Sequence, residues 1–116
     1  MVEKRGLQQL QATAPLAGGV FGTTVAANMR RYIYKIKTAN QFAGPNQLNL
    51  GYSDDAGVTH TDLDYIEHAV QYDMWTDPDE VKEDSLPIYI IPAGNQIYME
   101  TDAGNIECYF LYEDSE

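Results

Sequence analysis

The sequence predicts an all-β protein, a small antiparallel β-sandwich or jelly roll with an extended N-terminal arm. Hydrophobic and polar residues alternate with a period of two along several short segments, which is typical of strands with one buried face. Clusters of Gly, Pro, Asn and Asp separate these segments. About seven such segments fit into residues 29–116, and that number of short strands is typical of sandwiches and jelly rolls.

Residues 1–28 differ in amino-acid composition from the rest of the chain. Glycine and other small residues are frequent there and disfavour regular structure, yet large apolar residues are scattered among them. A flexible linker would lack those apolar residues. We therefore predict an extended arm, residues 1–28, ahead of a β-sandwich domain, residues 29–116. Its apolar side chains would dock on another subunit, a larger partner or the chain's own domain; the alternative is a mobile tail.

The first half of the predicted domain contains three strands. Residues 29–39 alternate, residues 40–46 contain Gly-Pro-Asn and predict a turn, and residues 48–52 alternate again. Residues 53–57 carry the Asp and Gly of a hairpin turn, after which residues 58–61 resume as a strand.

Strict alternation through residues 29–39 assigns two faces to that strand. It places Tyr32, Tyr34 and Ile36 on one face and Arg31, Ile33, Lys35 and Lys37 on the other. Four of the seven basic residues, Arg30, Arg31, Lys35 and Lys37, lie in this strand. This basic stripe would meet acidic residues of a neighbour, or be an exposed face balanced by the protein's own carboxylates.

The segment from Asp62 to Tyr72 fits two structures. Thr61 and Asp64 resemble a capping box followed by an apolar helical face. Equally, Ile66, Val70 and Tyr72 fit a strand face that would include His68. Because strands are predicted on both sides, we favour a strand over residues 65–74. Residues 77–81 resemble a short helical turn with Asp and Pro at its start.

The C-terminal part gives the clearest strand signal. Residues 88–91 are β-branched and aromatic, and two alternating segments, 96–101 and 106–112, follow across Gly- and Asn-containing turns. The predicted buried faces consist of Ile97 and Met99 in the first of these segments and Ile106, Cys108, Phe110 and Tyr112 in the second. Cys108 is the only cysteine, so no internal disulfide is possible, and it is predicted to be a core residue.

Charge and hydropathy exclude several function classes. With 18 acidic and 7 basic residues, the net charge of −11 repels phosphate backbones and anionic lipids, which argues against nucleic-acid and membrane partners. The sequence contains neither an apolar run of about 18 residues nor a secretory signal. We expect a soluble protein that stays inside a cell or is assembled into a particle there.

Candidate chemistry is sparse. His60, Asp62 and Asp64 alternate, so on a strand they would share a face and present an imidazole and two carboxylates to a metal, or simply line a solvated face. None of the serines lies in a nucleophile-elbow sequence. We expect no catalytic residues and no cofactor, and therefore no enzyme.

The aromatic residues suggest carbohydrate binding as an alternative function. Trp75 with Tyr65, Tyr72, Tyr89 and Tyr98 could form a platform on which sugar rings stack. The alternative is that these side chains fill the core or an oligomer interface.

The overall layout resembles a known family. A Gly/Ala-rich arm is followed by Met29-Arg30-Arg31-Tyr32-Ile33-Tyr34-Lys35-Ile36, and the domain closes with Pro87-Ile88-Tyr89-Ile90-Ile91-Pro92-Ala93-Gly94 and an alternating hairpin. This layout is similar to that of the small jelly-roll capsid decoration (cement) proteins of tailed viruses that infect bacteria and archaea. The resemblance implies a structural virion protein that binds the outer capsid surface, with the major capsid protein as partner. It also implies homotrimers that bridge neighbouring capsid subunits.

Under this interpretation the arm supplies the contacts. Burying Leu16, Val20 and Phe21 across a subunit seam would contribute roughly 1.5–3 kcal/mol each before ordering costs. The full predicted set for capsid or subunit binding is Leu16, Val20, Phe21, Val25, Arg30 and Arg31. The competing hypotheses are a carbohydrate-binding module at Trp75 and, third, a metal-dependent hydrolase at His60.

Overall fold

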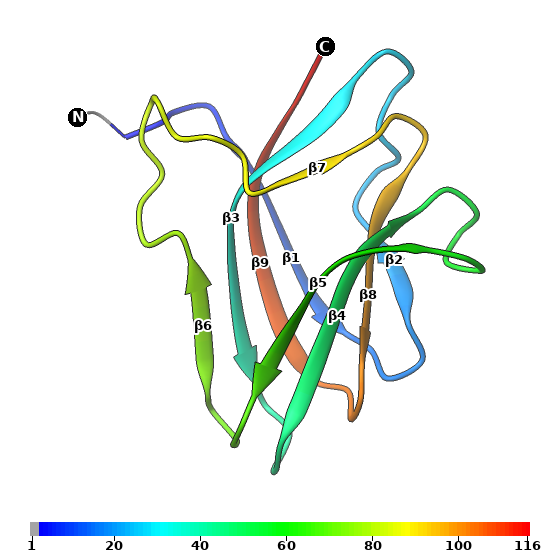
Figure 1. Ribbon diagram of the computed structural model, residues 1–116, viewed down its shortest axis with the longest axis vertical. Helices are drawn as coiled ribbons and strands as arrows, with labels where there is room; N and C mark the ends of the chain where they lie inside the picture. Colours follow the sequence, from blue (N-terminus) through cyan, green and yellow to red (C-terminus); the bar gives the residue numbers. More distant parts are fainter. Residues whose placement is uncertain (1–2) are drawn as a thin grey trace.

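A computed structural model describes residues 3–116 as two antiparallel sheets packed face to face (Figure 1). The strands are β1 (Gln8–Ala14), β2 (Gly19–Phe21), β3 (Arg30–Asn40), β4 (Asn46–Ser53), β5 (Thr61–His68), β6 (Met74–Asp77), β7 (Tyr89–Ile91), β8 (Gln96–Thr101) and β9 (Ile106–Ser115). The predicted all-β sandwich is confirmed. Within the described residues, no helix is long and apolar enough to cross a membrane.

The strand order is that of a jelly roll. The first sheet runs β1-β9-β3-β6, with β7 also paired to β3, and the second runs β2-β8-β4-β5. Strand β7 pairs with residues 31–33 of β3 and strand β6 with residues 36–39. These two short strands therefore occupy one position in two pieces, which leaves four positions in each sheet, as expected for a jelly roll.

The core lies between the sheets and contains the predicted faces of the last two strands. Ile97 and Met99 of β8 and Ile106 and Phe110 of β9 are fully buried. Cys108 is buried beside them, and burial raises the pKa of its thiol to about 12, so the thiol stays protonated. The prediction that Cys108 is a core residue is confirmed.

Strand β3 differs from its predicted alternation. Its pairing with β9 shifts register between Ile33 and Lys35, and this bulge at Tyr34 turns the following residues over. As a result Ile33 and Ile36 are both buried, although alternation assigned them to opposite faces. Arg31 is buried on the same side as Ile33, so it does not belong to a surface stripe with Lys37.

The predicted arm is part of the sandwich. Strand β1 pairs with β9 over seven residues and β2 pairs with β8 over three. Ala14 and Val25 are buried in the common core. Of the docking partners left open for this segment, the structure therefore shows the chain's own domain. Met1 and Val2 lie outside the described residues.

The ambiguous segment forms two strands. Strand β5 ends at His68 and β6 begins at Met74, with a turn at residues 69–73 where a single strand over 65–74 was favoured. The helical alternative is wrong because residues 61–68 form strand β5. The helical turn at 77–81 is also wrong, because residues 78–81 are irregular. The strand predicted from residue 58 begins only at Thr61, and Val58 lies in an exposed loop.

Candidate binding surface

The six residues predicted to bind a partner do not form one surface. Leu16 and Arg30 are exposed, and Val20 and Phe21 are half-buried on β2. Phe21 pairs with the buried Ile97 and packs against the core. Val25 and Arg31 are each only 1% exposed, so these two cannot contact a partner.

The Arg31 side chain makes its polar contacts within the chain's own fold. Its Nε and Nη2 atoms donate to the two carboxylate oxygens of Asp114 at 2.8 and 2.9 Å. Nη1 donates to the backbone oxygen of Thr23 at 2.8 Å, and the guanidinium lies 4.6 Å from the centre of the Tyr112 ring. A buried guanidinium needs such partners. Arg31 thus joins β3 and β9 to the segment between β2 and β3.

The hypothesised metal ligands are separated by a second bulge. Pairing of β4 with β5 shifts register after Leu50, where Gly51 lies so close to Thr61 that an added Cβ would be 2.2 Å from its backbone oxygen. Asp62 lies 3.0 Å from His60 Nε2, and the Tyr65 hydroxyl donates to it, lowering the pKa of that carboxyl.

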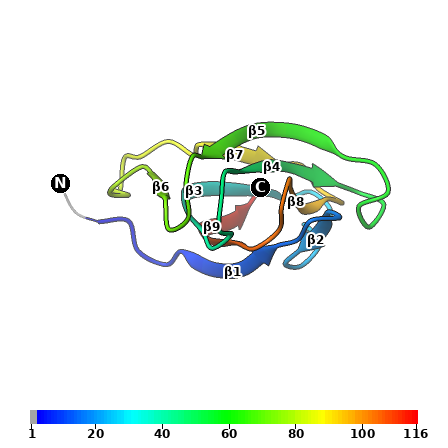
Figure 2. The ribbon, with the colours of Figure 1, turned by 90° about the horizontal axis from the view of Figure 1, so that it is seen from below.

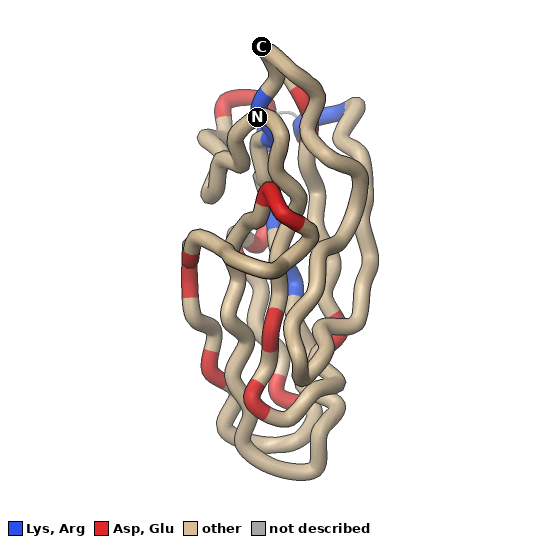
Figure 3. Tube along the Cα trace, turned by 90° about the vertical axis from the view of Figure 1, so that its right-hand side faces the viewer, with Lys and Arg blue, Asp and Glu red and all other residues tan. Residues whose placement is uncertain are grey.

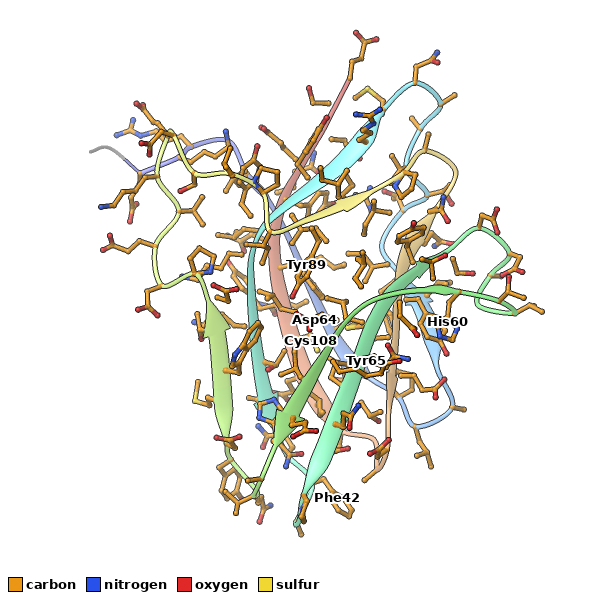
Figure 4. All side chains as sticks on the ribbon, in the orientation of Figure 1. Phe42, His60, Asp64, Tyr65, Tyr89 and Cys108 are labelled. Carbon is orange, nitrogen blue, oxygen red and sulfur yellow. The ribbon has the colours of Figure 1, made fainter. Side chains whose placement is uncertain are left out.

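Asp64 lies apart from these two groups. It accepts a 2.7 Å hydrogen bond from the Tyr89 hydroxyl of the other sheet (Figure 4). Among residues 3–116, no three His, Cys, Asp or Glu side chains are close enough together to hold a metal ion.

The five aromatic side chains proposed for sugar stacking lie in three places. Trp75 and Tyr89 pair with the inward-facing Thr38 and Ile33 on β3, so they point between the sheets. Tyr98 and Tyr65 lie on the outer face of the second sheet, and the His60 ring stacks on Tyr98 with 4.0 Å between centroids. Tyr72 lies in the turn after β5. No single platform results.

A chain of three residues resembles a catalytic triad. The hydroxyl of Thr38 lies 2.9 Å from His68 Nε2, and His68 Nδ1 lies 3.0 Å from an Asp73 carboxylate oxygen. A carboxylate only accepts, so His68 Nδ1 donates to it. Thr38 and His68 are 2% and 1% exposed, which leaves a substrate no access. The chain links β3, β5 and the turn at 69–73 structurally.

Four connections meet at one end of the sandwich, at the lower side of Figure 1. They are residues 15–18, 41–45, 69–73 and 102–105, here called the loop end. Hydrogen bonds join neighbouring connections: Tyr72 N to Asn40 O, Gln41 N to Asn105 O, and Thr101 N to Pro15 O. The loop end is therefore one connected unit.

Two buried asparagines hold the loop end from inside. Asn40 Nδ2 donates to the backbone oxygens of Gly44 and Val70, both at 2.9 Å. Asn46 Nδ2 donates to Gly104 O at 2.7 Å, and its Oδ1 accepts from Ala103 N. These amides satisfy loop backbone groups that would otherwise lack partners.

The loop end exposes large apolar side chains. Of the nine exposed large hydrophobic residues in the described part of the chain, five belong to it or its margin: Leu16, Phe42, Val70, Tyr72 and Met74. Figure 4 shows Phe42 at the tip of the β3–β4 connection. Tyr72, 69% exposed, has a φ of 67°, a left-handed conformation unusual for a bulky residue. Concentrated exposed apolar residues mark interaction surfaces.

Beyond Met74, the outer face of the first sheet is mixed in polarity. There Met74 borders an open groove of about 410 Å³ that crosses β1, β9 and β3. Its other side-chain walls include Gln11, Lys37 and Tyr109, with the Lys37 ammonium 5.9 Å from the centre of the Tyr109 ring.

Comparisons with protein-family models, curated proteins and solved structures found no match. The site therefore rests on its own geometry. Sequence reasoning found Leu16 for partner binding and considered Tyr72 only for sugar stacking. It missed Phe42, Val70 and Met74; Val70 was assigned to a strand face. The glycine- and asparagine-containing turns were the available signal, since they show where strands end.

Proposed function

We propose that this chain is a non-enzymatic structural protein of a virion, a decoration protein that binds the outer surface of the capsid and bridges neighbouring capsid subunits. The observation that supports this role best is the loop end, where five exposed apolar side chains lie on or beside loops held by buried amides. The resemblance of the sequence to jelly-roll decoration proteins supplies the identity of the partner, the major capsid protein.

The physical basis is burial of apolar area on a prepared surface. Each large side chain removed from water contributes about 1.5–3 kcal/mol, from which the cost of ordering is subtracted. Loops already fixed by Asn40 and Asn46 lose little further freedom on binding. A shell that presents many equivalent sites makes modest individual contacts sufficient for stable coverage.

The test is co-sedimentation of the full chain with emptied viral shells from the source culture. We expect saturation at a fixed ratio to the major capsid subunit. The role does not require the homotrimer that the resemblance implies. Failure of the chain to enter the pellet under gentle salt conditions would contradict the proposal.

Two exposed valines provide a matched pair of variants. Val70 lies at the loop end and is 59% exposed, whereas Val58 lies in the β4–β5 loop and is 83% exposed. Val70→Lys places a charge in the contact and should weaken shell binding roughly tenfold or more, while Val58→Lys should bind like the unmodified chain. Equal binding by both variants would exclude the loop end as the contact.

A further inference from the structure

Strand β1 forms an unprotected sheet edge. It is seven residues long, contains no proline and pairs with β9 without a register shift from Gln8↔Tyr112 to Ala14↔Ile106. Figure 2 shows it along one margin of the molecule. An exposed edge of this kind can pair with another strand. Edge strands are therefore usually short, interrupted by a β-bulge, or lined with charged side chains.

The other edges carry those protections. Strands β2 and β7 have three residues each and β6 has four. Strand β5 is one residue longer than β1 but is bulged and carries Asp62, Asp64 and Glu67. Protection at every edge except β1 indicates that β1 has a partner.

The distribution of charge also favours β1 as the contact between two copies. The chain has a net charge of −11, yet no charged residue occurs from Gly6 to Met29. Two copies of an acidic protein repel each other over most of their surfaces. At β1 they can approach without placing like charges opposite each other.

We propose that β1 pairs antiparallel with β1 of a second copy, about a two-fold axis at Gln11, joining the two first sheets into one continuous sheet. In this register Leu10 faces Ala12 of the second copy on the inner side. On the outer side Gln9 faces Thr13 of the second copy, and the two Gln11 side chains face each other. The contact is isologous and closes as a dimer.

Strand pairing supplies main-chain hydrogen bonds, and the alternating side chains determine the register. Since the dimer contains no ion pair across β1, salt acts only by screening repulsion between the acidic copies. Dimerisation therefore strengthens with added salt.

The test measures the molar mass of the full chain by sedimentation over a range of concentrations. We expect a monomer–dimer equilibrium that approaches twice the 13.0 kDa of the chain and shifts toward the dimer as salt is added. A monomer at every concentration, or a trimer, would overturn the proposal.

Lysine substitutions test whether β1 forms the dimer contact. Gln11→Lys places two ammonium groups at the axis and should weaken dimerisation roughly tenfold or more. The control is Val58→Lys, which adds the same charge at an exposed residue of the β4–β5 loop and should leave the dimer unchanged. Unchanged dimerisation of Gln11→Lys would remove β1 from the contact.

A charge pair tests the register. In the double variant Gln9→Lys, Thr13→Glu, each lysine faces a glutamate of the second copy on the exposed outer side. This variant should still dimerise, but added salt should now weaken its dimer, the reverse of the unmodified chain. The same salt response as the unmodified chain would contradict the two-fold register.

Discussion

The two ends of the sandwich are held together by different chemistry. At the loop end, neutral amides of Asn40 and Asn46 satisfy the backbone of the connections, and the Asp73 carboxylate accepts from His68. At the opposite end, carboxylates do this work: Asp114 binds Arg31, and Asp55 accepts hydrogen bonds from Ser53 and Thr59 within the β4–β5 loop. Figure 3 shows most Lys and Arg positions toward the end where the termini lie.

This difference explains which end can bind an apolar surface. Ionic groups keep their stability only while they are hydrated or paired, so an end built on them is costly to bury. Amides that are already satisfied inside the fold add no such cost. Exposed Phe42, Val70 and Tyr72 therefore lie at the end whose backbone groups are satisfied by neutral amides. A partner surface that covers them has to leave the exposed Asp102 in water or pair it.

The largest expected effect is at Arg31. Arg31→Ala should lower the free energy of unfolding by about 3 kcal/mol, because it removes a buried partner of Asp114 and leaves the Thr23 oxygen unsatisfied. Urea unfolding measures this, with exposed Arg30→Ala as control at about 0.5 kcal/mol or less. Similar losses for both variants would show that the buried pair does not secure this end.

Removing an amide at the loop end should have the next largest effect. Asn46→Ala leaves Gly104 O and Ala103 N without their partner and should cost about 2 kcal/mol. Asn49→Ala is the control on the same strand, since the buried Oδ1 of Asn49 has no hydrogen-bond partner in the described structure, and it should cost less. If Asn49→Ala were the more damaging change, the structural role assigned to Asn46 would be wrong.

Tyr72 should show opposite effects on stability and binding. Tyr72→Gly relieves the left-handed backbone of a bulky residue and should raise the free energy of unfolding by about 0.5 kcal/mol after the entropy of glycine is subtracted. The same variant should bind shells more weakly. Asn105→Gly, at another left-handed position, serves as control and should change stability less. A more stable variant with unchanged binding would place Tyr72 outside the contact.

The smallest expected effect is local and depends on pH. Hydrogen bonds from the Thr59 hydroxyl and backbone, then from Ser53, lower the pKa of Asp55 to about 2 from the ordinary value of 3.8. The folded pKa lies below the unfolded one, so this stabilisation is present above about pH 4 and is lost as the pH falls toward 2.

Amide hydrogen exchange between about pH 4 and 2 should differ at the two ends of the sandwich. Protection of Thr59 N–H should fall between pH 4 and 2, beyond the intrinsic change in exchange rate, while protection of Phe42 N–H, which donates to Asn40, should not. The Asp55→Asn variant should lack the step at Thr59. Equal loss at both amides would indicate general acid unfolding instead.

Strands could be predicted where alternation is unbroken, as in β8 and β9. Faces could not be predicted across the bulges at Tyr34 and Gly51, because a bulge reverses the alternation without leaving a clear sequence signal. Strand β1 was missed because Gln and Ala are weak strand formers, and its structure depends on pairing with β9, almost a hundred residues away.

The candidate surface was less predictable than the fold. Leu16 was identified because an apolar residue in a Gly-rich segment is conspicuous. Arg31 was assigned to the surface although a guanidinium can be buried when Asp114 and Thr23 satisfy it. Exposure of Val70 and Tyr72 depends on how four distant connections meet, which no local pattern encodes.

Hydrogen exchange of the chain bound to emptied shells, compared with the free chain, tests the central claim most directly. Binding through the loop end predicts added protection in residues 15–18, 41–45 and 69–73, and no change in residues 54–60 of the β4–β5 loop. Added protection in residues 54–60, with residues 69–73 exchanging as in the free chain, would contradict the claim.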